Sequence, residues 1–105
     1  MAMQAAGARR WIDVGKPIAM AVARRDGTVT AETFRAAAAE LGKLPPTYGA
    51  QRALSWLPAL FAELVKEGQL RKARNPDGTS AKRYSKDMGN DQVVYRVATP
   101  AERDR

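Results

Sequence analysis

The order of the segments between residues 28 and 97 is the feature that most constrains the fold of this chain. Two amphipathic runs, 31–41 and 48–67, are separated by Gly-Lys-Leu-Pro-Pro at 42–46. A proline inside a helix removes a hydrogen bond and clashes with the preceding turn, so this connection cannot be helical. Segments rich in cations and in β-branched or aromatic residues follow directly. We therefore expect two helices joined by a turn and followed by antiparallel strands, which is an α+β domain.

Apolar residues at helical spacing predict the buried face of each helix of this pair. In the first helix these residues are Phe34, Ala37, Ala38 and Leu41. In the longer run they are Leu54, Leu57, Phe61, Leu64 and Val65. Thr30 suits the N-cap position before the first helix. Pro58 lies on the polar face of the longer run, where it predicts either a bend in one helix or a junction between two helices.

An earlier helix is expected to begin near Pro17, which suits a first helical turn, and to end at Asp26. Residues 1–10 are small and end in two arginines, so they are expected to form a flexible basic arm. Residues 99–105 are polar and are expected to form a frayed tail. The remaining residues, 11–98, are expected to form one domain, because 105 residues have room for one modest core.

The C-terminal half contains three segments that are typical of strands. Residues 69–74 are the first, and Asn-Pro-Asp-Gly at 75–78 is a strong turn signal after it. Residues 82–86 are the second, and the third, 92–98, alternates as a strand does. The pattern leaves open whether 82–86 pairs as a middle strand or lies within a long connection.

The chain carries a strong excess of positive charge. Lys and Arg number 18 against 11 acidic residues, which gives a net charge of +7. A compact domain with such a charge favours a polyanionic partner. Residues 66–87 contain seven of the cations and only three acidic residues. These cations are Lys66, Arg71, Lys72, Arg74, Lys82, Arg83 and Lys86.

The order of helix, short strand, helix, turn, helix and hairpin resembles the winged helix-turn-helix superfamily over about residues 16–98. The most similar part is Leu60–Arg74, where a helix ends at Gly68 and passes directly into a strand. The resemblance implies three helices plus a C-terminal β-hairpin or three-stranded wing. Pro58 within the second helix of the pair departs from the pattern, as does the long stretch between the two outer strands.

In that superfamily the second helix of the pair enters the major groove of DNA with its N-terminal residues at the base edges. In this chain those residues are Tyr48, Gln51, Arg52 and Ser55. Glutamine can pair with adenine and arginine with guanine, so these side chains are candidates for reading bases. The alternative is that they form a solvated helix face.

The basic hairpin is the second candidate contact with DNA. Its cations would meet phosphate groups, and the residues concerned are Arg71, Lys72, Arg74, Lys82, Arg83 and Lys86. Tyr84 lies among them and is placed to lie along a sugar or a base. The alternative is an edge strand that charge protects from aggregation.

Composition excludes much other chemistry. The chain has no Cys and no His, so it has no disulfides, thiolate ligands or imidazole ligands. It has no glycine-rich phosphate loop and its carboxylates are scattered, so we expect no enzyme, no metal site and no cofactor. No apolar run approaches the roughly 20 residues of a membrane span, and residues 1–10 lack the apolar core of a signal peptide. We expect a cytoplasmic protein without a membrane partner.

The sequence thus predicts a protein that binds double-stranded DNA. A transcriptional regulator or a DNA-transaction accessory factor of a bacterium or phage is the favoured role. The main alternative is a winged-helix protein-interaction module, such as a phage-encoded inhibitor or an assembly subunit. RNA binding by the same basic surface is a third hypothesis. The sequence leaves the oligomeric state open, with a homodimer as one option.

Overall fold

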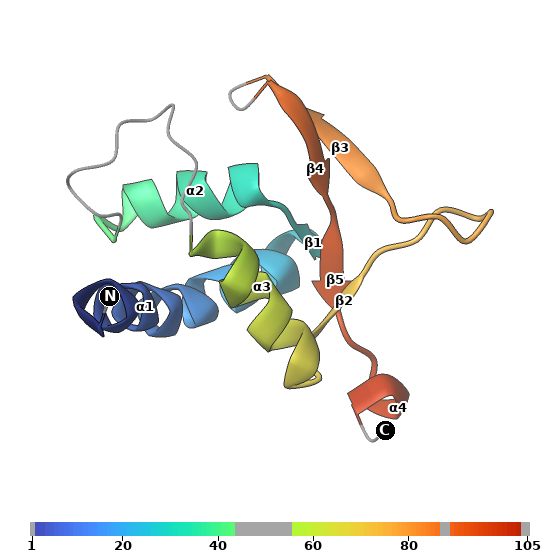
Figure 1. Cartoon of the computed structure of the whole chain (residues 1–105). Coiled ribbons are helices and arrows are strands. Elements are labelled where there is room, and N and C mark those ends of the chain that lie inside the picture. Colours follow the sequence, from blue (N-terminus) through green and yellow to red (C-terminus); the bar gives the residue numbers. More distant parts are fainter. Residues whose placement is uncertain (1, 44–55, 87–88, 104–105) are drawn as a thin grey trace.

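A computed structural model of the chain describes residues 2–43, 56–86 and 89–103, with the side chains of these ranges described from Arg9 to Glu102. Its elements in chain order are α1 (Ala2–Asp26), β1 (Thr28–Val29), α2 (Ala31–Glu40), α3 (Leu57–Lys66), β2 (Leu70–Lys72), β3 (Lys82–Ser85), β4 (Asn90–Val93), β5 (Tyr95–Val97) and α4 (Pro100–Arg103). Helices and short antiparallel strands combine in an α+β fold, as predicted (Figure 1). The described residues hold four helices, whereas the resemblance implied three.

The strands form a three-stranded sheet in the order β1-β5-β2 and a separate two-stranded sheet, β3-β4. Val94 lies where the two sheets meet. Its N–H donates to the carbonyl of Ala81 at 3.1 Å, and its carbonyl accepts from the N–H of Ala73 at 2.8 Å. The single strand predicted over 92–98 is therefore two strands. Residues 82–85 pair only with the first of them, as a hairpin that projects beyond the three-stranded sheet (Figure 1).

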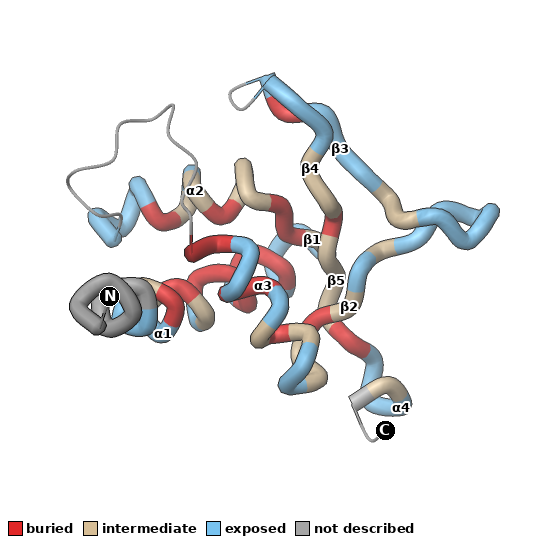
Figure 2. Tube along the Cα trace, in the orientation of Figure 1, coloured by how far each residue is buried: buried red, intermediate tan, exposed pale blue. Residues whose placement is uncertain are grey.

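Aromatic rings form the centre of the core. Phe61 of α3 stacks on Tyr95 of β5 with ring centroids 4.5 Å apart, and it meets Phe34 of α2 edge-on at 6.4 Å. Phe34 also meets Trp56 edge-on at 6.1 Å, and Trp56 lies against Trp11 of α1. The rings thus join elements that are distant in sequence. Figure 2 shows the buried residues on the sides of α1, α2 and α3 that face one another.

The predicted buried faces are largely confirmed. The predicted residues that are buried are Phe34, Ala38, Leu57, Phe61 and Leu64. Thr30 is the N-cap of α2, and its hydroxyl accepts from the N–H of Thr33 at 3.2 Å. The prediction for Leu41 was wrong, because α2 ends one residue earlier and Leu41 is 61% exposed. Leu54 lies outside the described residues.

The first helix differs most from its prediction. α1 begins at Ala2, so the predicted start near Pro17 was wrong and residues 2–10, predicted as an arm, belong to this helix. Pro17 lies inside the helix at an exposed position. Ile12 and Gly15 are buried on the N-terminal side of the proline, so tertiary packing extends the helix through it.

α3 explains the role of Pro58. The helix begins at Leu57, so Pro58 occupies its first turn, where a missing N–H leaves no helical hydrogen bond unmade. The proline therefore starts this helix instead of bending it. The predicted helical residues 48–55 lie outside the described part of the chain. At the other end Gly68 has φ +79° and its N–H donates to the carbonyl of Val65 at 3.0 Å, so the chain leaves the helix there as predicted.

The C-terminal segment is more regular than the predicted frayed tail. α4 covers Pro100–Arg103. The N–H of Thr99 donates to Oε1 of Glu102 at 2.9 Å, and the N–H of Glu102 donates to the hydroxyl of Thr99 at 3.3 Å. Residues 99–103 are thus held by a reciprocal pair of hydrogen bonds at the start of a short helix.

Replacing Phe61 with alanine should cost about 3–5 kcal/mol of unfolding free energy, because the change leaves a cavity between α2, α3 and β5. Urea denaturation of the purified variant measures this loss. Lys66→Ala, on the exposed side of the same helix, is the matched control and should change stability by less than about 0.5 kcal/mol. Equal unfolding midpoints for the two variants would contradict the facing of α3.

Candidate nucleic-acid interface

The hairpin formed by β3 and β4 has two different faces. Lys82 and Tyr84 share one face, and Arg83 and Ser85 share the other, because side chains alternate along a strand. Ser85 is fully buried, and Nη2 of Arg83 donates to Oγ1 of Thr28 at 3.4 Å, so the second face is turned toward the body of the protein. Tyr84 on the first face is 63% exposed. The Lys82–Tyr84 face is therefore the more open of the two, and it also carries Asp91 of β4, which lies opposite Tyr84. Arg83 is itself exposed.

The turn before β3 is held by its own hydrogen bonds. Oδ1 of Asp77 accepts from the hydroxyl of Thr79 at 2.6 Å and from its backbone N–H at 2.9 Å. These bonds lower the pKa of Asp77 below its ordinary value. Gly78 has φ +89°, and its carbonyl accepts from Nη1 of Arg74 at 2.9 Å. The predicted turn is confirmed, and the hydrogen bonds of Asp77 are made within it rather than to the neighbouring cations.

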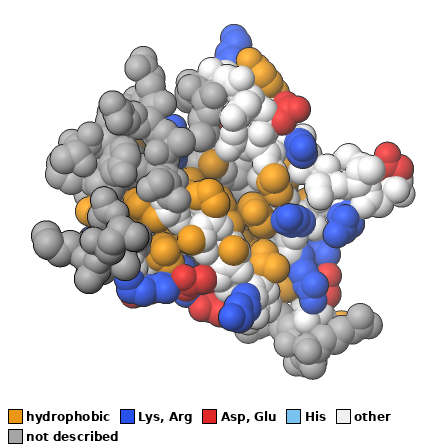
Figure 3. Space-filling model, viewed as in Figure 1, with side chains coloured by type: hydrophobic (Ala, Val, Ile, Leu, Met, Phe, Trp, Pro, Cys, Tyr) orange, Lys and Arg blue, Asp and Glu red, His pale blue; other side chains and the backbone are white. Residues whose placement is uncertain are grey.

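Several cations of the basic segment have no carboxylate partner among residues 2–43, 56–86 and 89–103. They are Lys66, Lys72, Lys82 and Lys86, and all four are exposed. Figure 3 shows Lys and Arg side chains gathered on the side of the molecule that carries the strands. Unpaired, solvated cations on a projecting hairpin and a neighbouring strand are suited to phosphate contacts.

Many of the carboxylates are instead paired on the helices. Glu63 of α3 accepts from Arg9 of α1 at 2.7 and 2.8 Å and forms an ion pair with Lys16 of α1 at 2.8 Å. Lys16 also pairs with Glu67 at 2.6 Å, and Arg9 pairs with Asp13 at 2.7 Å. The hydrogen bonds from Arg9 and Lys16 lower the pKa of Glu63 to about 2. This network joins α1 to α3 and neutralises acids away from the hairpin.

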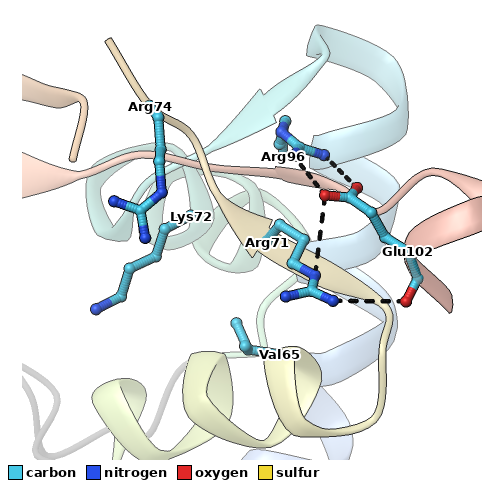
Figure 4. Close-up of a pocket in the computed structure, with 6 residues that line it drawn as sticks. All are labelled: Val65, Arg71, Lys72, Arg74, Arg96 and Glu102. Carbon is cyan, nitrogen blue, oxygen red and sulfur yellow. Dashed lines mark hydrogen bonds and ion pairs between the residues drawn. The ribbon is translucent and has the colours of Figure 1, made fainter. Parts of the chain in front are cut away.

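A pocket of about 430 Å³ lies at β2, an edge strand of the larger sheet. Its lining residues are Val65, Arg71, Lys72, Arg74, Arg96 and Glu102 (Figure 4). Both terminal nitrogens of Arg96 donate to the carboxylate of Glu102, at 2.7 and 2.8 Å. Nε of Arg71 lies 4.0 Å from that carboxylate, and Nη2 of Arg71 donates to the backbone carbonyl of Glu102 at 3.5 Å. The hydrogen bonds from Arg96 are the main reason that the pKa of Glu102 falls to about 2.

The predicted site residues fall into three sets. Arg71, Lys72 and Arg74 line the pocket at β2. Lys82 and Arg83 lie on β3, and Lys86 follows it. Tyr48, Gln51, Arg52 and Ser55 lie outside the described residues.

Arg96 and Glu102 line the same pocket but were not among the predicted site residues. Arg96 becomes the neighbour of Arg71 only through the pairing of β2 with β5. Glu102 comes near both arginines from α4, the short helix that directly follows β5. The one available signal was the position of Arg96 among the apolar residues of a predicted strand.

The exposed face of α3 is small and largely apolar. Pro58, Ala59 and Ala62 are exposed on it, Val65 is half-buried, and Lys66 supplies its cation. In Figure 3 hydrophobic side chains are visible near the centre of the view, with Lys and Arg toward the strands. This face permits close approach of another macromolecule but supplies little charge of its own.

No helix among the described residues is long and apolar enough to cross a bilayer. The acidic side chains of that part of the chain form no group of three that could hold a metal ion. Comparisons of the chain with models of protein families, with curated proteins and with solved structures found no match. Function must therefore be inferred from geometry and charge.

The network between α1 and α3 should make stability depend on pH. Because the pKa of Glu63 falls from 4.5 to about 2 on folding, the unfolded chain binds more protons than the folded chain between these values. The stabilisation is therefore complete above about pH 4.5 and is lost as the pH falls toward 2. Glu63→Gln should be less stable than the parent at about pH 6 and should lose less stability between about pH 6 and pH 3. Urea denaturation at the two pH values measures both effects.

Glu40→Gln provides the control for this pH series. Glu40 is exposed at the end of α2 and forms no ion pair with a described residue. The unfolding free energy of Glu40→Gln should match that of the parent at both pH values. Glu102 also has a lowered pKa, so the dependence should weaken in Glu63→Gln without vanishing. If the stability of Glu63→Gln depended on pH as strongly as that of the parent, the network would contribute nothing to the pH dependence.

Proposed function

We propose that this protein binds double-stranded DNA as a winged helix-turn-helix domain, and acts as a transcriptional regulator or a DNA-transaction accessory factor. The observation that carries the proposal is the distribution of charge. Lys72, Lys82 and Lys86 have no carboxylate partner within the described residues, while Glu63 and Glu102 are held in ion pairs with other cations. A hairpin that carries unpaired cations beyond the body of a protein matches the requirement for phosphate contact.

The arrangement of elements supports this proposal. β1 lies between α1 and α2 in sequence and pairs with β5, and α3 passes through Gly68 into β2. The β3-β4 hairpin then projects as a wing would (Figure 1). In this proposal α3 belongs to the recognition element, and Tyr48, Gln51, Arg52 and Ser55 remain the proposed base contacts. Lys72, Arg74, Lys82, Arg83 and Lys86 are the proposed phosphate contacts.

A protein-interaction module is the second candidate, and the exposed face of α3 favours it. Pro58, Ala59 and Ala62 give this face an apolar surface without bulky side chains. Apolar contact at the centre with cations at the rim is a common pattern in protein–protein interfaces. The DNA proposal ranks first because the excess of charge, +7 for the whole chain, has no role in an apolar contact.

Binding to a duplex should fall steeply with salt. About five or six phosphate contacts, at about 0.9 per contact, give a slope of roughly −4 to −6 in a plot of log affinity against log salt concentration. Fluorescence anisotropy with a labelled duplex at several salt concentrations measures the slope. Complete absence of duplex binding at low salt would remove the DNA proposal and leave the α3 face as the basis for a protein partner.

The two proposed contact regions should respond differently to substitution. Lys82→Ala and Lys86→Ala should weaken binding to all duplexes alike and reduce the salt slope by about one each. Gln51→Ala and Arg52→Ala should cost about 1–3 kcal/mol on a preferred site and little on a scrambled duplex. Arg10→Ala is the control, since Arg10 is exposed on α1 with its guanidinium over Trp11. A change of sequence preference in the hairpin variants alone would reverse these roles.

A further inference from the structure

The pocket at β2 holds more positive charge than its own carboxylate neutralises. Four of its lining side chains are cations, Arg71, Lys72, Arg74 and Arg96, and one is an anion, Glu102. Lys72 forms no ion pair with any described residue, and Arg74 donates to a backbone carbonyl rather than to a carboxylate. The pocket is therefore electropositive even with Glu102 in place. Such a site favours an anion that carries more than one charge.

Backbone pairing holds two of these cations side by side. Arg71 and Arg96 are directly opposed in the β2-β5 ladder. Like charges at opposed positions repel each other, so an anion between them is favourable. The carboxylate of Glu102 is that anion, but it interacts unequally with the two arginines. It accepts two short hydrogen bonds from Arg96 and lies 4.0 Å from Nε of Arg71. Arg71 therefore has fewer hydrogen bonds to a carboxylate than Arg96 has.

Nε of Arg71 has no hydrogen-bond acceptor in the described structure. The atom is shielded from solvent, although the side chain as a whole is 42% exposed. A buried donor without an acceptor is costly, and more so on a charged group. Figure 4 shows the guanidinium of Arg71 above Val65, with Lys72 and Arg74 on one side and Glu102 on the other. An anion with several oxygens that bound beside Lys72 would offer Arg71 the hydrogen-bond acceptors that Glu102 does not provide.

We propose that this pocket is a phosphate-binding site, and that Glu102 is an intramolecular carboxylate that occupies part of it. Arginine forms paired hydrogen bonds with phosphate, and phosphate offers more acceptor oxygens than a carboxylate. The volume of about 430 Å³ falls within the range of about 300–1,000 Å³ that is usual for small-molecule sites. The phosphate belongs either to a DNA backbone or to a free di- or oligophosphate. The site does not depend on DNA binding by the hairpin.

Glu102 then acts as a competitor built into the chain. It reaches the pocket from α4, a helix of only four residues that directly follows β5. Its carboxylate is charged at neutral pH, so it repels a phosphate while it binds Arg96. Glutamine at this position removes the charge and keeps an oxygen that can accept from Arg96. The substitution should therefore open the site to phosphate without releasing α4.

Titration calorimetry with inorganic pyrophosphate, in magnesium-free buffer at low salt, tests the site without any DNA. The parent should bind pyrophosphate, and Arg71→Ala should bind it about 10- to 100-fold more weakly, as expected for loss of hydrogen bonds to a charged group. Lys72→Ala should also weaken binding, and its side chain makes no ion pair with a described residue whose loss would affect folding. Glu102→Gln should tighten binding about 10-fold. Arg10→Ala should bind as the parent does.

Duplex competition identifies the source of the phosphate. If pyrophosphate displaces a labelled duplex and Arg71→Ala weakens duplex binding, the site takes a backbone phosphate. If pyrophosphate binds and leaves duplex affinity unchanged, the site takes a free phosphate compound. Failure of both the parent and Glu102→Gln to bind pyrophosphate at low salt would overturn the proposal, whatever the duplex result. Equal pyrophosphate affinity in the parent and Glu102→Gln would overturn the competitor role of Glu102.

Discussion

The packing of Phe61 between Phe34 and Tyr95 is the contact on which the rest of the structure depends. These three rings join α2, α3 and β5, and β5 is the central strand between β1 and β2. Gly15 brings α1 against the same group, since a Cβ atom there would lie 2.6 Å from Cδ1 of Leu60. One small core therefore fixes the relative positions of three helices and the larger sheet. The exposed surfaces on these elements are positioned by the same core.

The projecting hairpin takes its direction from this core through Val94. That residue is buried and directly precedes β5, and its N–H and carbonyl bond to Ala81 and Ala73 on either side. The β3-β4 hairpin therefore leaves the sheet at a defined point. Its lysines form no ion pair with a described carboxylate, although Asp91 of β4 lies opposite Tyr84 on the same face. Glu63 and Glu67 are held in ion pairs with residues of α1. The fold thus leaves exposed lysines without ion pairs on β2 and beside and within the hairpin, which is the basis of the proposed binding to DNA.

The hairpin and the pocket at β2 use the same chemistry in different settings. Lys82 and Tyr84 lie on an open, exposed face, which they share with Asp91 of β4. Arg71 and Arg96 lie in a concave site that already contains a carboxylate, so an incoming phosphate has to compete with Glu102. The first setting suits many weak contacts that salt screens readily. The second suits one well-placed anion, held by geometry as much as by charge.

The sequence by itself determined the features whose signals lie within a few residues. Thr30 begins α2, Gly68 ends α3, and the turn after β2 forms where its residues predict it. The tertiary structure decided the helix through Pro17 and the pairing of Arg71 with Arg96 across β2 and β5. The physical reason is one of range. Caps and turns depend on hydrogen bonds between near neighbours, whereas burial, strand register and ion pairing depend on groups that meet only when the chain folds.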